Sequence, residues 1–197
     1  MRYILGLTGS IGMGKSTTTR MFADLGCAVW DADAAVHRLY APGGGAVDEI
    51  AAQFPDAIKN GAVSRDALKR IIAEEETALA RVEAIVHPLV AADRETFLVN
   101  AETDIVVLDI PLLFEGGYDA KVDGTVCVTA PPEVQRARVL ERGTMSEAQF
   151  KALLAKQMSD AEKRARATWV IETDTLEHAK AQVQAVVDAI RQEKSNA

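Results

Sequence analysis

The stretch Gly9-Ser10-Ile11-Gly12-Met13-Gly14-Lys15-Ser16 decides the fold of this chain. It fits the pattern Gly-x-x-x-x-Gly-Lys-Ser/Thr, follows a short apolar run and opens a helical pattern. Glycines let the main chain turn around a phosphate without a Cβ clash, and the amides of such a turn and of a helix start point at the anion. This stretch, called the phosphate loop below, therefore predicts binding of a nucleotide through its phosphates.

Side chains at the end of the phosphate loop have predicted tasks. Lys15 is expected to reach the β- and γ-phosphates of the nucleotide, and the hydroxyl of Ser16 is expected to bind Mg²⁺. Thr17 continues the helix at its polar start. The expected ligand is thus a nucleoside triphosphate with its magnesium ion.

Strand and helix patterns alternate on both sides of the loop, which predicts a parallel α/β sheet. The run at 105–108 is β-branched and continuous, which is typical of a strand buried on both faces. Helices are expected from 15 to 25, from 31 onward, after Pro132 up to Arg142, and at the end of the chain, where Asp174 could cap the last one. The expected strands are 3–8, 28–30, 105–108, 125–128 and 169–171.

Residues 46–99 differ from the rest of the chain. They contain no clear strand, and their apolar positions follow helical spacing. Pro88 is expected to end or kink its helix near His87. An all-helical subdomain inserted between two strands of the sheet is therefore predicted.

The motifs that are missing narrow the class of protein. A GTPase switch normally needs Asp-x-x-Gly for the γ-phosphate and Asn-Lys-x-Asp for guanine, and neither pattern occurs in the sequence. A motor or transport ATPase would normally be larger than 197 residues. A small kinase is the leading class.

A kinase needs a carboxylate that accepts or orients the proton of the acceptor hydroxyl. Asp33, just after the second predicted strand, is the first choice, although an aspartate there could instead cap the following helix. Asp31 and Asp109 are possible magnesium partners through water, since both follow strands at the edge where ligands bind in such sheets.

Residues 136–166 carry a net charge of +4 in a chain whose net charge is −7. This segment could be a solvated helical hairpin or a lid that closes over ATP. An arginine near the transferred phosphoryl group can supply about 10³–10⁵ in rate. Arg142, at a helix end beside Gly143, is ranked above Arg138 for this task.

Composition excludes several other functions. The acidic balance argues against binding nucleic acid or an anionic membrane over the whole surface. No segment has the roughly 18 apolar residues that cross a bilayer, and the N-terminal apolar run is too short for a signal peptide. Cys27 and Cys127 form no Cys-x-x-Cys pair and are expected to be buried thiols. A cytoplasmic protein is the expectation, and a monomer is favoured over an obligate oligomer.

With these residues in view, the chain resembles the dephospho-coenzyme A kinase family. The phosphate loop is shared by many unrelated proteins, whereas the other matching motifs in this order are far more specific. They are Asp31-Ala32-Asp33, His87-Pro88, Pro111-Leu112-Leu113-Phe114-Glu115, Gln135 with Arg142, and Gln157-Met158. The resemblance implies a phosphotransferase that moves the γ-phosphate of ATP to the ribose 3′-hydroxyl of dephospho-coenzyme A, the last step of coenzyme A synthesis.

The family also implies a division of labour along the chain. The expected fold is a P-loop type, five-stranded parallel sheet flanked by helices (1–41, 104–135 and 167–197), with a helical coenzyme-binding subdomain (42–103) and a helical lid (136–166). Asp33 would serve the acceptor hydroxyl, and Arg142 and Arg138 would reach ATP from the lid. His87 and the stretch Leu112, Leu113, Phe114 and Glu115 would line the acceptor pocket. ATP would be held by Gly9, Gly12, Met13, Gly14, Lys15, Ser16 and Thr17.

The chain departs from the family pattern near the fifth predicted strand, and the family pattern itself varies at position 109. Where the family often reads Ala-Asp-x-Val-Ile-x-Asn, this chain has Thr168 in place of the Asp and Thr173 in place of the Asn. An acid at position 109 is not uniform in the family either. A nucleoside or nucleotide monophosphate kinase on the same fold stays open as an alternative, as does a nucleotide-dependent switch protein.

Overall fold

The computed structural model describes residues 2–196 and consists of two compact units. The first contains the chain up to Trp30 and from Ala101 onward, and the second contains Asp31–Asn100. Each unit has its own hydrophobic core.

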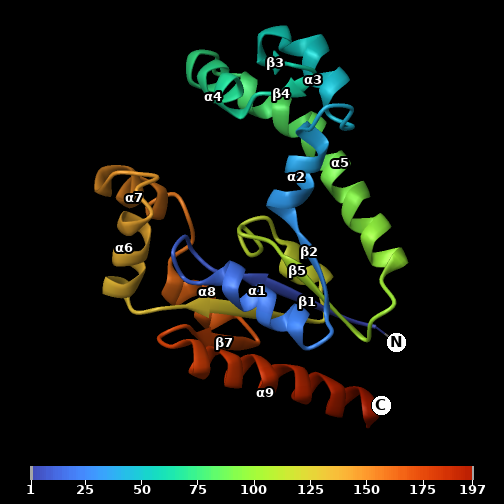
Figure 1. Cartoon of the computed structure of the whole chain (residues 1–197), viewed down its shortest axis with the longest axis vertical. Helices are drawn as coiled ribbons and strands as arrows, with labels where there is room; N and C mark the ends of the chain where they lie inside the picture. The colour runs from blue at the N-terminus through green and yellow to red at the C-terminus, as the bar shows by residue number, and fades with distance from the viewer. Residues whose placement is uncertain (1, 197) are drawn as a thin grey trace. The chain divides into compact units, whose positions relative to one another are not determined.

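The first unit is built on a five-stranded parallel sheet with the strand order β2-β5-β1-β6-β7 (Figure 1). β1 pairs with β5 on one side and with β6 on the other, and Leu7 lies in register with Asp109. All five predicted strands are confirmed, with no end moved by more than one residue. Their bounds are β1 (Tyr3–Thr8), β2 (Ala28–Asp31), β5 (Ile105–Asp109), β6 (Gly124–Thr129) and β7 (Trp169–Glu172).

The core of this unit lies between the sheet and two helices, α1 (Lys15–Asp24) and α9 (Leu176–Ser195) (Figure 1). Every residue of β5 and β6 is buried, as continuous apolar runs in a parallel sheet should be. Phe22 of α1 and Val183 of α9 belong to the same buried cluster as Leu5 and Leu7 of β1. The remaining helices are the 3₁₀ helix η2 (Tyr118–Lys121), α6 (Pro132–Glu141), α7 (Glu147–Leu154) and α8 (Asp160–Arg166).

The start of α9 corrects one prediction. Its N-cap is Thr175, whose hydroxyl accepts a hydrogen bond of 3.1 Å from the His178 amide, and not Asp174. Asp174 stands one residue too early for that amide. Its carboxylate instead accepts from the Thr175 amide at 2.7 Å and pairs with the His178 ring at 2.7 Å.

The second unit contains helices and one small hairpin, so the prediction of an all-helical block was wrong. β3 (Ile58–Lys59) and β4 (Ala62–Val63) pair antiparallel around Asn60 and Gly61, which both have positive φ angles of 51° and 76°. Asn-Gly is the turn pair that such two-residue hairpins favour. The helical elements are α2 (Ala32–Tyr40), α3 (Val47–Gln53), the 3₁₀ helix η1 (Pro55–Ala57), α4 (Arg65–Glu74) and α5 (Ala78–Asn100).

Pro88 does not end its helix, so the first of the two outcomes predicted for it was wrong: α5 runs on for twelve more residues to Asn100. Proline removes the hydrogen bond to the carbonyl four residues earlier, here that of Ala84. Ala84 and Pro88 are both exposed, so water can satisfy that carbonyl. Val82, Ile85 and Val86 lie in the core of the unit and hold the helix in place.

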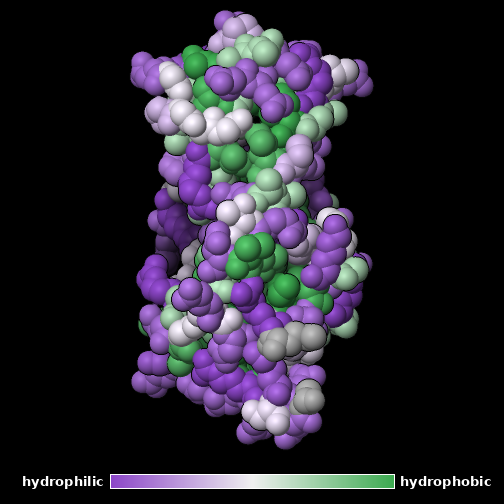
Figure 2. Space-filling model, turned by 90° about the vertical axis from the view of Figure 1, so that its right-hand side faces the viewer, coloured by the Kyte–Doolittle hydropathy of each residue, from purple (hydrophilic) through white to green (hydrophobic). Residues whose placement is uncertain are grey.

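The surface is mostly hydrophilic on the face that Figure 2 shows, and hydrophobic residues gather there in separate patches. Large hydrophobic residues with exposed side chains include Leu79, Val99, Leu112, Val170 and Leu176. Among the described residues, no helix has the combination of length and apolar character that crossing a membrane requires.

Both cysteines are free and buried, as predicted. Burial away from water disfavours the thiolate, and it raises the pKa of Cys27 to about 11 and that of Cys127 to about 12. These thiols are therefore packing residues of the core and poor nucleophiles.

Candidate functional site

The phosphate loop joins β1 to α1 and has the backbone that its glycines allow. Gly12 and Gly14 have φ angles of 79° and 92°, a region that side chains strongly disfavour. A Cβ on Gly14 would stand 2.9 Å from the Thr173 hydroxyl, and one on Gly12 would stand 2.9 Å from the Gln135 carbonyl. Two independent reasons therefore require glycine at each of these positions: the positive φ angle and the lack of space for a Cβ.

Side chains from distant parts of the chain brace this loop. The Gln135 amide donates to the Ile11 carbonyl at 2.8 Å, and the Thr173 hydroxyl donates to the Met13 carbonyl at 2.7 Å. The Ala130 amide lies 3.1 Å from the Met13 sulfur, so this side chain is an anchor pointing into the protein. These contacts with the rest of the protein fix the conformation of the loop before any ligand binds.

Lys15 forms an ion pair with Asp109. Asp109 ends β5, is 1% exposed, and also accepts a hydrogen bond of 2.9 Å from the Thr19 hydroxyl. β5 lies beside β1, which places this carboxylate next to the start of α1. The carboxylate thus holds the lysine that was predicted to reach the phosphates, and its predicted role at magnesium stays a prediction.

A pocket of about 450 Å³ opens beside the phosphate loop. Its walls come from the start of α1, the end of α6 and the turn before α9. It brings four of the predicted ATP residues to one place, namely Gly14, Thr17, Arg138 and Arg142. Leu176, which is 69% exposed, adds an apolar surface at the same pocket.

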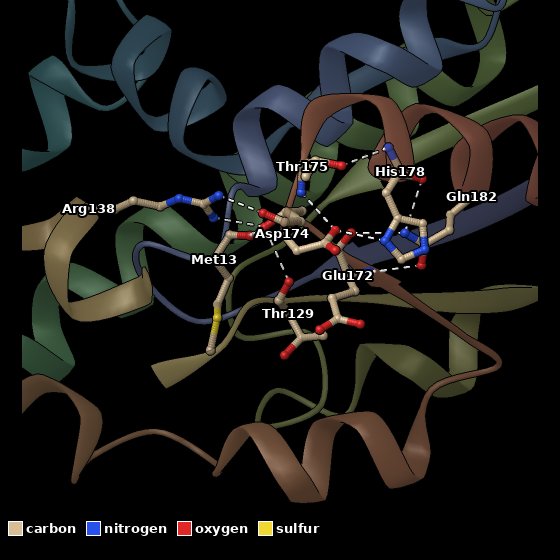
Figure 3. Close-up of polar contacts among 9 residues, drawn as sticks. Met13, Thr129, Arg138, Glu172, Asp174, Thr175, His178 and Gln182 are labelled. Atoms are coloured by element: carbon tan, nitrogen blue, oxygen red, sulfur yellow. Dashed lines mark hydrogen bonds and ion pairs between the residues drawn. The ribbon is translucent and has the colours of Figure 1, made fainter. Parts of the chain in front are cut away.

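The turn that forms one wall of the pocket is fixed at both ends (Figure 3). Gln182 of α9 exchanges two hydrogen bonds with the main chain of Glu172, at 3.0 and 2.9 Å. The hydrogen bond from His178 holds the pKa of Asp174 below its ordinary range. The wall is therefore a structured turn and presents Thr173 through Leu176 in a fixed order.

Arg138 and Arg142 differ in their surroundings. The Arg138 guanidinium donates to the Thr173 hydroxyl at 2.9 Å and to the Thr173 carbonyl at 2.6 Å (Figure 3). Arg142 is exposed and follows the last residue of α6 as its C-cap. Contact of either arginine with ATP stays a prediction, and Arg142 is the one whose exposure favours it.

Thr168, the other departure from the family pattern, lies away from the pocket. Its hydroxyl accepts from the Thr125 amide at 3.0 Å, and its amide donates to the Thr125 hydroxyl at 3.0 Å. These reciprocal bonds join the starts of β6 and β7. Thr168 is therefore a structural residue of the sheet, whereas Thr173 contacts the site.

The segment after β5 was predicted to line the acceptor pocket, and its residues divide into two kinds. Leu112 is 48% exposed, whereas Leu113 and Phe114 are buried. The Leu113 side chain fills the space over Gly6, and the Arg166 guanidinium lies 4.8 Å from the Phe114 ring centroid. Leu113 and Phe114 are packed as core residues, and their contact with an acceptor stays a prediction.

Glu115 pairs with a lysine that sequence reasoning did not select. Lys163 of α8 has no exposed surface, lies 3.0 Å from the Glu115 carboxylate and donates to the Pro111 carbonyl at 3.2 Å. Burial of Glu115 raises its pKa, but the hydrogen bonds from Lys163 and from the Met158 amide outweigh this and leave the pKa lowered. The pair ties α8 to the segment after β5.

Replacing Lys163 with methionine is expected to lower the free energy of unfolding by about 3 kcal/mol at pH 7, because the partner carboxylate loses its cation. A carboxylate with a lowered pKa stabilises the fold above its ordinary pKa and loses that contribution as the pH falls through its folded value. The difference in free energy of unfolding between wild type and variant should therefore shrink as the pH falls below the folded-state pKa of Glu115. Urea unfolding at several pH values measures it.

The exposed ion pair Arg136–Glu147 supplies the control for this experiment. Arg136→Met removes a cation from α6, yet its unfolding midpoint should stay close to that of the wild type. Equal loss of stability in the two variants would contradict a special role of Lys163.

The second unit carries the predicted acceptor-side residues Asp31, Asp33 and His87. Asp31 is the N-cap of α2, and its carboxylate accepts from the Ala34 amide at 2.8 Å. Asp33 lies in the first turn of α2 and is exposed, so the alternative that Asp33 caps this helix was wrong. His87 is exposed on α5. The roles of these residues toward a substrate or a metal stay predictions.

The residues present could bind Mg²⁺ only together with the phosphates of a nucleotide. Within residues 2–196, no group of three or more histidine, cysteine or acidic side chains could hold a metal. Mg²⁺ commonly takes one or two protein oxygens together with substrate phosphates and water, so a complete protein cage is not needed. The exposed Ser16 hydroxyl at the start of α1 is one such oxygen.

The fold and the loop together define a P-loop protein of the small kinase type. A glycine-rich loop connects the first strand to a helix that begins with lysine, and β5 lies beside β1 in the parallel sheet. The comparisons with known proteins give the family. Residues 3–178 match the family model described as Dephospho-CoA kinase. The chain belongs to the dephospho-CoA kinase family, as the sequence motifs predicted.

Curated relatives cover the chain almost completely. It is 63% identical over 191 residues to the dephospho-CoA kinase of Ruegeria pomeroyi, with 97% of each chain covered. It is 64% identical over 188 residues to that of Cereibacter sphaeroides, with 95% of each covered. Among solved structures, TT1252 from Thermus thermophilus is 36% identical with a TM-score of 0.85, over 95% of this chain and 97% of that one.

Proposed function

We propose that the chain transfers the γ-phosphate of ATP to the ribose 3′-hydroxyl of dephospho-coenzyme A, giving coenzyme A and ADP. Membership of the dephospho-CoA kinase family carries this proposal, because the match spans both the phosphate loop and the acceptor-side residues. The pocket beside Gly14 supports it as a place for the nucleoside of ATP.

The phosphate loop and the lid hold ATP in this proposal. Main-chain amides of the loop and the positive end of α1 bind the β- and γ-phosphates, and Lys15 neutralises them. Mg²⁺ would be held by the Ser16 hydroxyl, with Asp31 and Asp109 acting through water, and it would supply positive charge at the phosphates. Arg142, from the end of α6, meets the charge that develops on the transferred group.

Asp33 is the proposed catalytic base. β2 ends at Asp31, and Asp33 follows two residues later in the first turn of α2. The 3′-oxygen of the ribose attacks the γ-phosphorus, the bond from that phosphorus to the bridging oxygen breaks, and Asp33 takes the hydroxyl proton. His87 and the stretch Leu112 to Glu115 are proposed to line the acceptor pocket.

The proposal assigns parts of the chain to these tasks. Residues 42–103 form the coenzyme-binding subdomain, 136–166 form the lid, and the remaining residues form the nucleotide core. The partner is a small molecule only, without nucleic acid or membrane. We place the protein in the cytoplasm as a monomer.

Replacing Arg142 with methionine is expected to lower kcat by about 10- to 100-fold, the equivalent of one hydrogen bond to a charged group. The KM for ATP should change less, because the charge that Arg142 meets develops in the transition state. Steady-state kinetics measure both constants. A raised KM with an unchanged kcat would instead make Arg142 a residue that binds ATP in the ground state.

A panel of acceptors tests the function itself. With ATP and Mg²⁺ present, release of ADP is measured with dephospho-coenzyme A, with nucleosides and with nucleoside monophosphates. The proposal expects turnover with dephospho-coenzyme A to exceed the others by orders of magnitude. Turnover with a nucleoside monophosphate alone would support the second kinase class, and tight nucleotide binding without transfer would support a switch protein.

A further inference from the structure

We infer that Thr173 is a positioning residue, which transmits the position of helix α6 to the phosphate loop through a directed pair of hydrogen bonds with Arg138 and Met13. This inference deepens the proposed function and rests on it. It assigns Arg138 to the same relay, as a residue that acts on the loop through Thr173.

Thr173 occupies a fixed place at the end of β7. It is 7% exposed, and its amide donates to the Thr129 carbonyl at 2.8 Å, next to the end of β6. The main chain of this residue therefore belongs to the sheet edge where ligands bind in parallel α/β proteins. Its side chain projects from that fixed point toward the phosphate loop, as the contact with the Met13 carbonyl shows.

The hydroxyl of Thr173 acts as donor and acceptor at once. It donates to the Met13 carbonyl at 2.7 Å, with the Thr129 carbonyl a more distant acceptor at 3.2 Å, and it accepts from Arg138 at 2.9 Å. A hydroxyl has a single proton, so the charged donor fixes the direction of the relay from Arg138 through Thr173 to Met13. A charged donor also strengthens the bond that follows.

The relay sets one peptide plane of the phosphate loop. The Met13 carbonyl is turned toward Thr173, and in a planar trans peptide the following amide, that of Gly14, points the opposite way. Gly14 packs against the Thr173 side chain, where a Cβ would stand 2.9 Å from its hydroxyl. The hydroxyl thus decides where an amide of the phosphate loop points.

The other end of the relay is in the lid. Arg138 lies in the last turn of α6, four residues before Arg142, so the two arginines share one face of the helix. Arg138 makes two bonds to Thr173, while Arg142 stays exposed beside the same pocket. A shift of α6 that moves Arg142 must also strain or break the hydrogen bonds that connect Arg138 through Thr173 to the Met13 carbonyl.

Four variants test the relay by direct measurement of ATP binding. Thr173→Val keeps the shape and removes the hydroxyl, and Arg138→Met removes the charged donor. Each is expected to weaken the affinity for ATP with Mg²⁺ about tenfold in calorimetry. The double variant should lose little more than either single one, because both changes break the same relay. Thr173→Ser keeps a hydroxyl and should restore affinity.

Thr168→Val is the matched control, since its hydroxyl is bonded to Thr125 outside the pocket. It should change the melting temperature without changing ATP affinity. Additive losses in the double variant, or loss of stability alone in Thr173→Val, would overturn the relay. ATP binding is measured without an acceptor. The affinities of the variants would therefore still test the relay if the proposed phosphate transfer failed.

Discussion

Replacing Asp33 with asparagine is expected to lower kcat by about 10²–10⁴-fold, the range that a positioned general base contributes. Asparagine has almost the same shape but cannot take the proton of the ribose hydroxyl. The affinity for ATP should stay unchanged, because Asp33 is assigned to the acceptor and not to the nucleotide. Single-turnover kinetics and calorimetry with an ATP analogue measure the two quantities separately.

Asp31→Asn is the matched control two residues earlier. Asparagine caps helices as well as aspartate does, so α2 should keep its N-terminus. This variant is expected to keep most of its kcat, and a raised requirement for magnesium would support the proposed metal role of Asp31. Equal losses of kcat and ATP affinity in Asp33→Asn would contradict its role as base.

The second large effect is expected for Lys15→Met. Removing one preorganised donor to the transferring phosphoryl group costs about 10²–10³ in rate, and kcat/KM for ATP should fall by that range. The variant also removes the Lys15 cation from beside the buried Asp109 carboxylate, so the free energy of unfolding should fall by about 3 kcal/mol. Steady-state kinetics and urea unfolding measure the two effects.

Asp109→Asn separates these two effects. It keeps the lysine and removes the buried charge, so it should be more stable than Lys15→Met and keep more of the kcat/KM for ATP, while a raised requirement for magnesium would support the proposed metal role of Asp109. Normal kinetics in Lys15→Met would contradict the assignment of the phosphate loop, whatever the stability of the variant.

The sheet could be predicted because its signals are local. Continuous apolar runs mark β5 and β6, and Gly9 to Ser16 mark the turn that follows β1. The errors arose where a local rule competes with another. Asn60-Gly61 is a hairpin signal inside a stretch of helical spacing, and Pro88 lies in a helix that tertiary packing carries past it.

The site could be predicted only in part, because its braces connect residues far apart in the chain. Thr173 bonds to Met13 across 160 positions, and Lys163 bonds to Pro111 across 52. Nothing in the sequence near Thr173 or Lys163 indicates these partners. Thr173 had one signal, its departure from the family pattern, and Lys163 had only its place in a basic segment.

The position of the transferred phosphate tests the central claim most directly. The protein is incubated with ATP, Mg²⁺ and dephospho-coenzyme A, and the product is analysed by ³¹P nuclear magnetic resonance and mass spectrometry. The account predicts one new phosphomonoester on the ribose 3′-oxygen, formed in equal amount with ADP. A phosphate at any other atom, or ATP bound but never transferred to this acceptor, would contradict it.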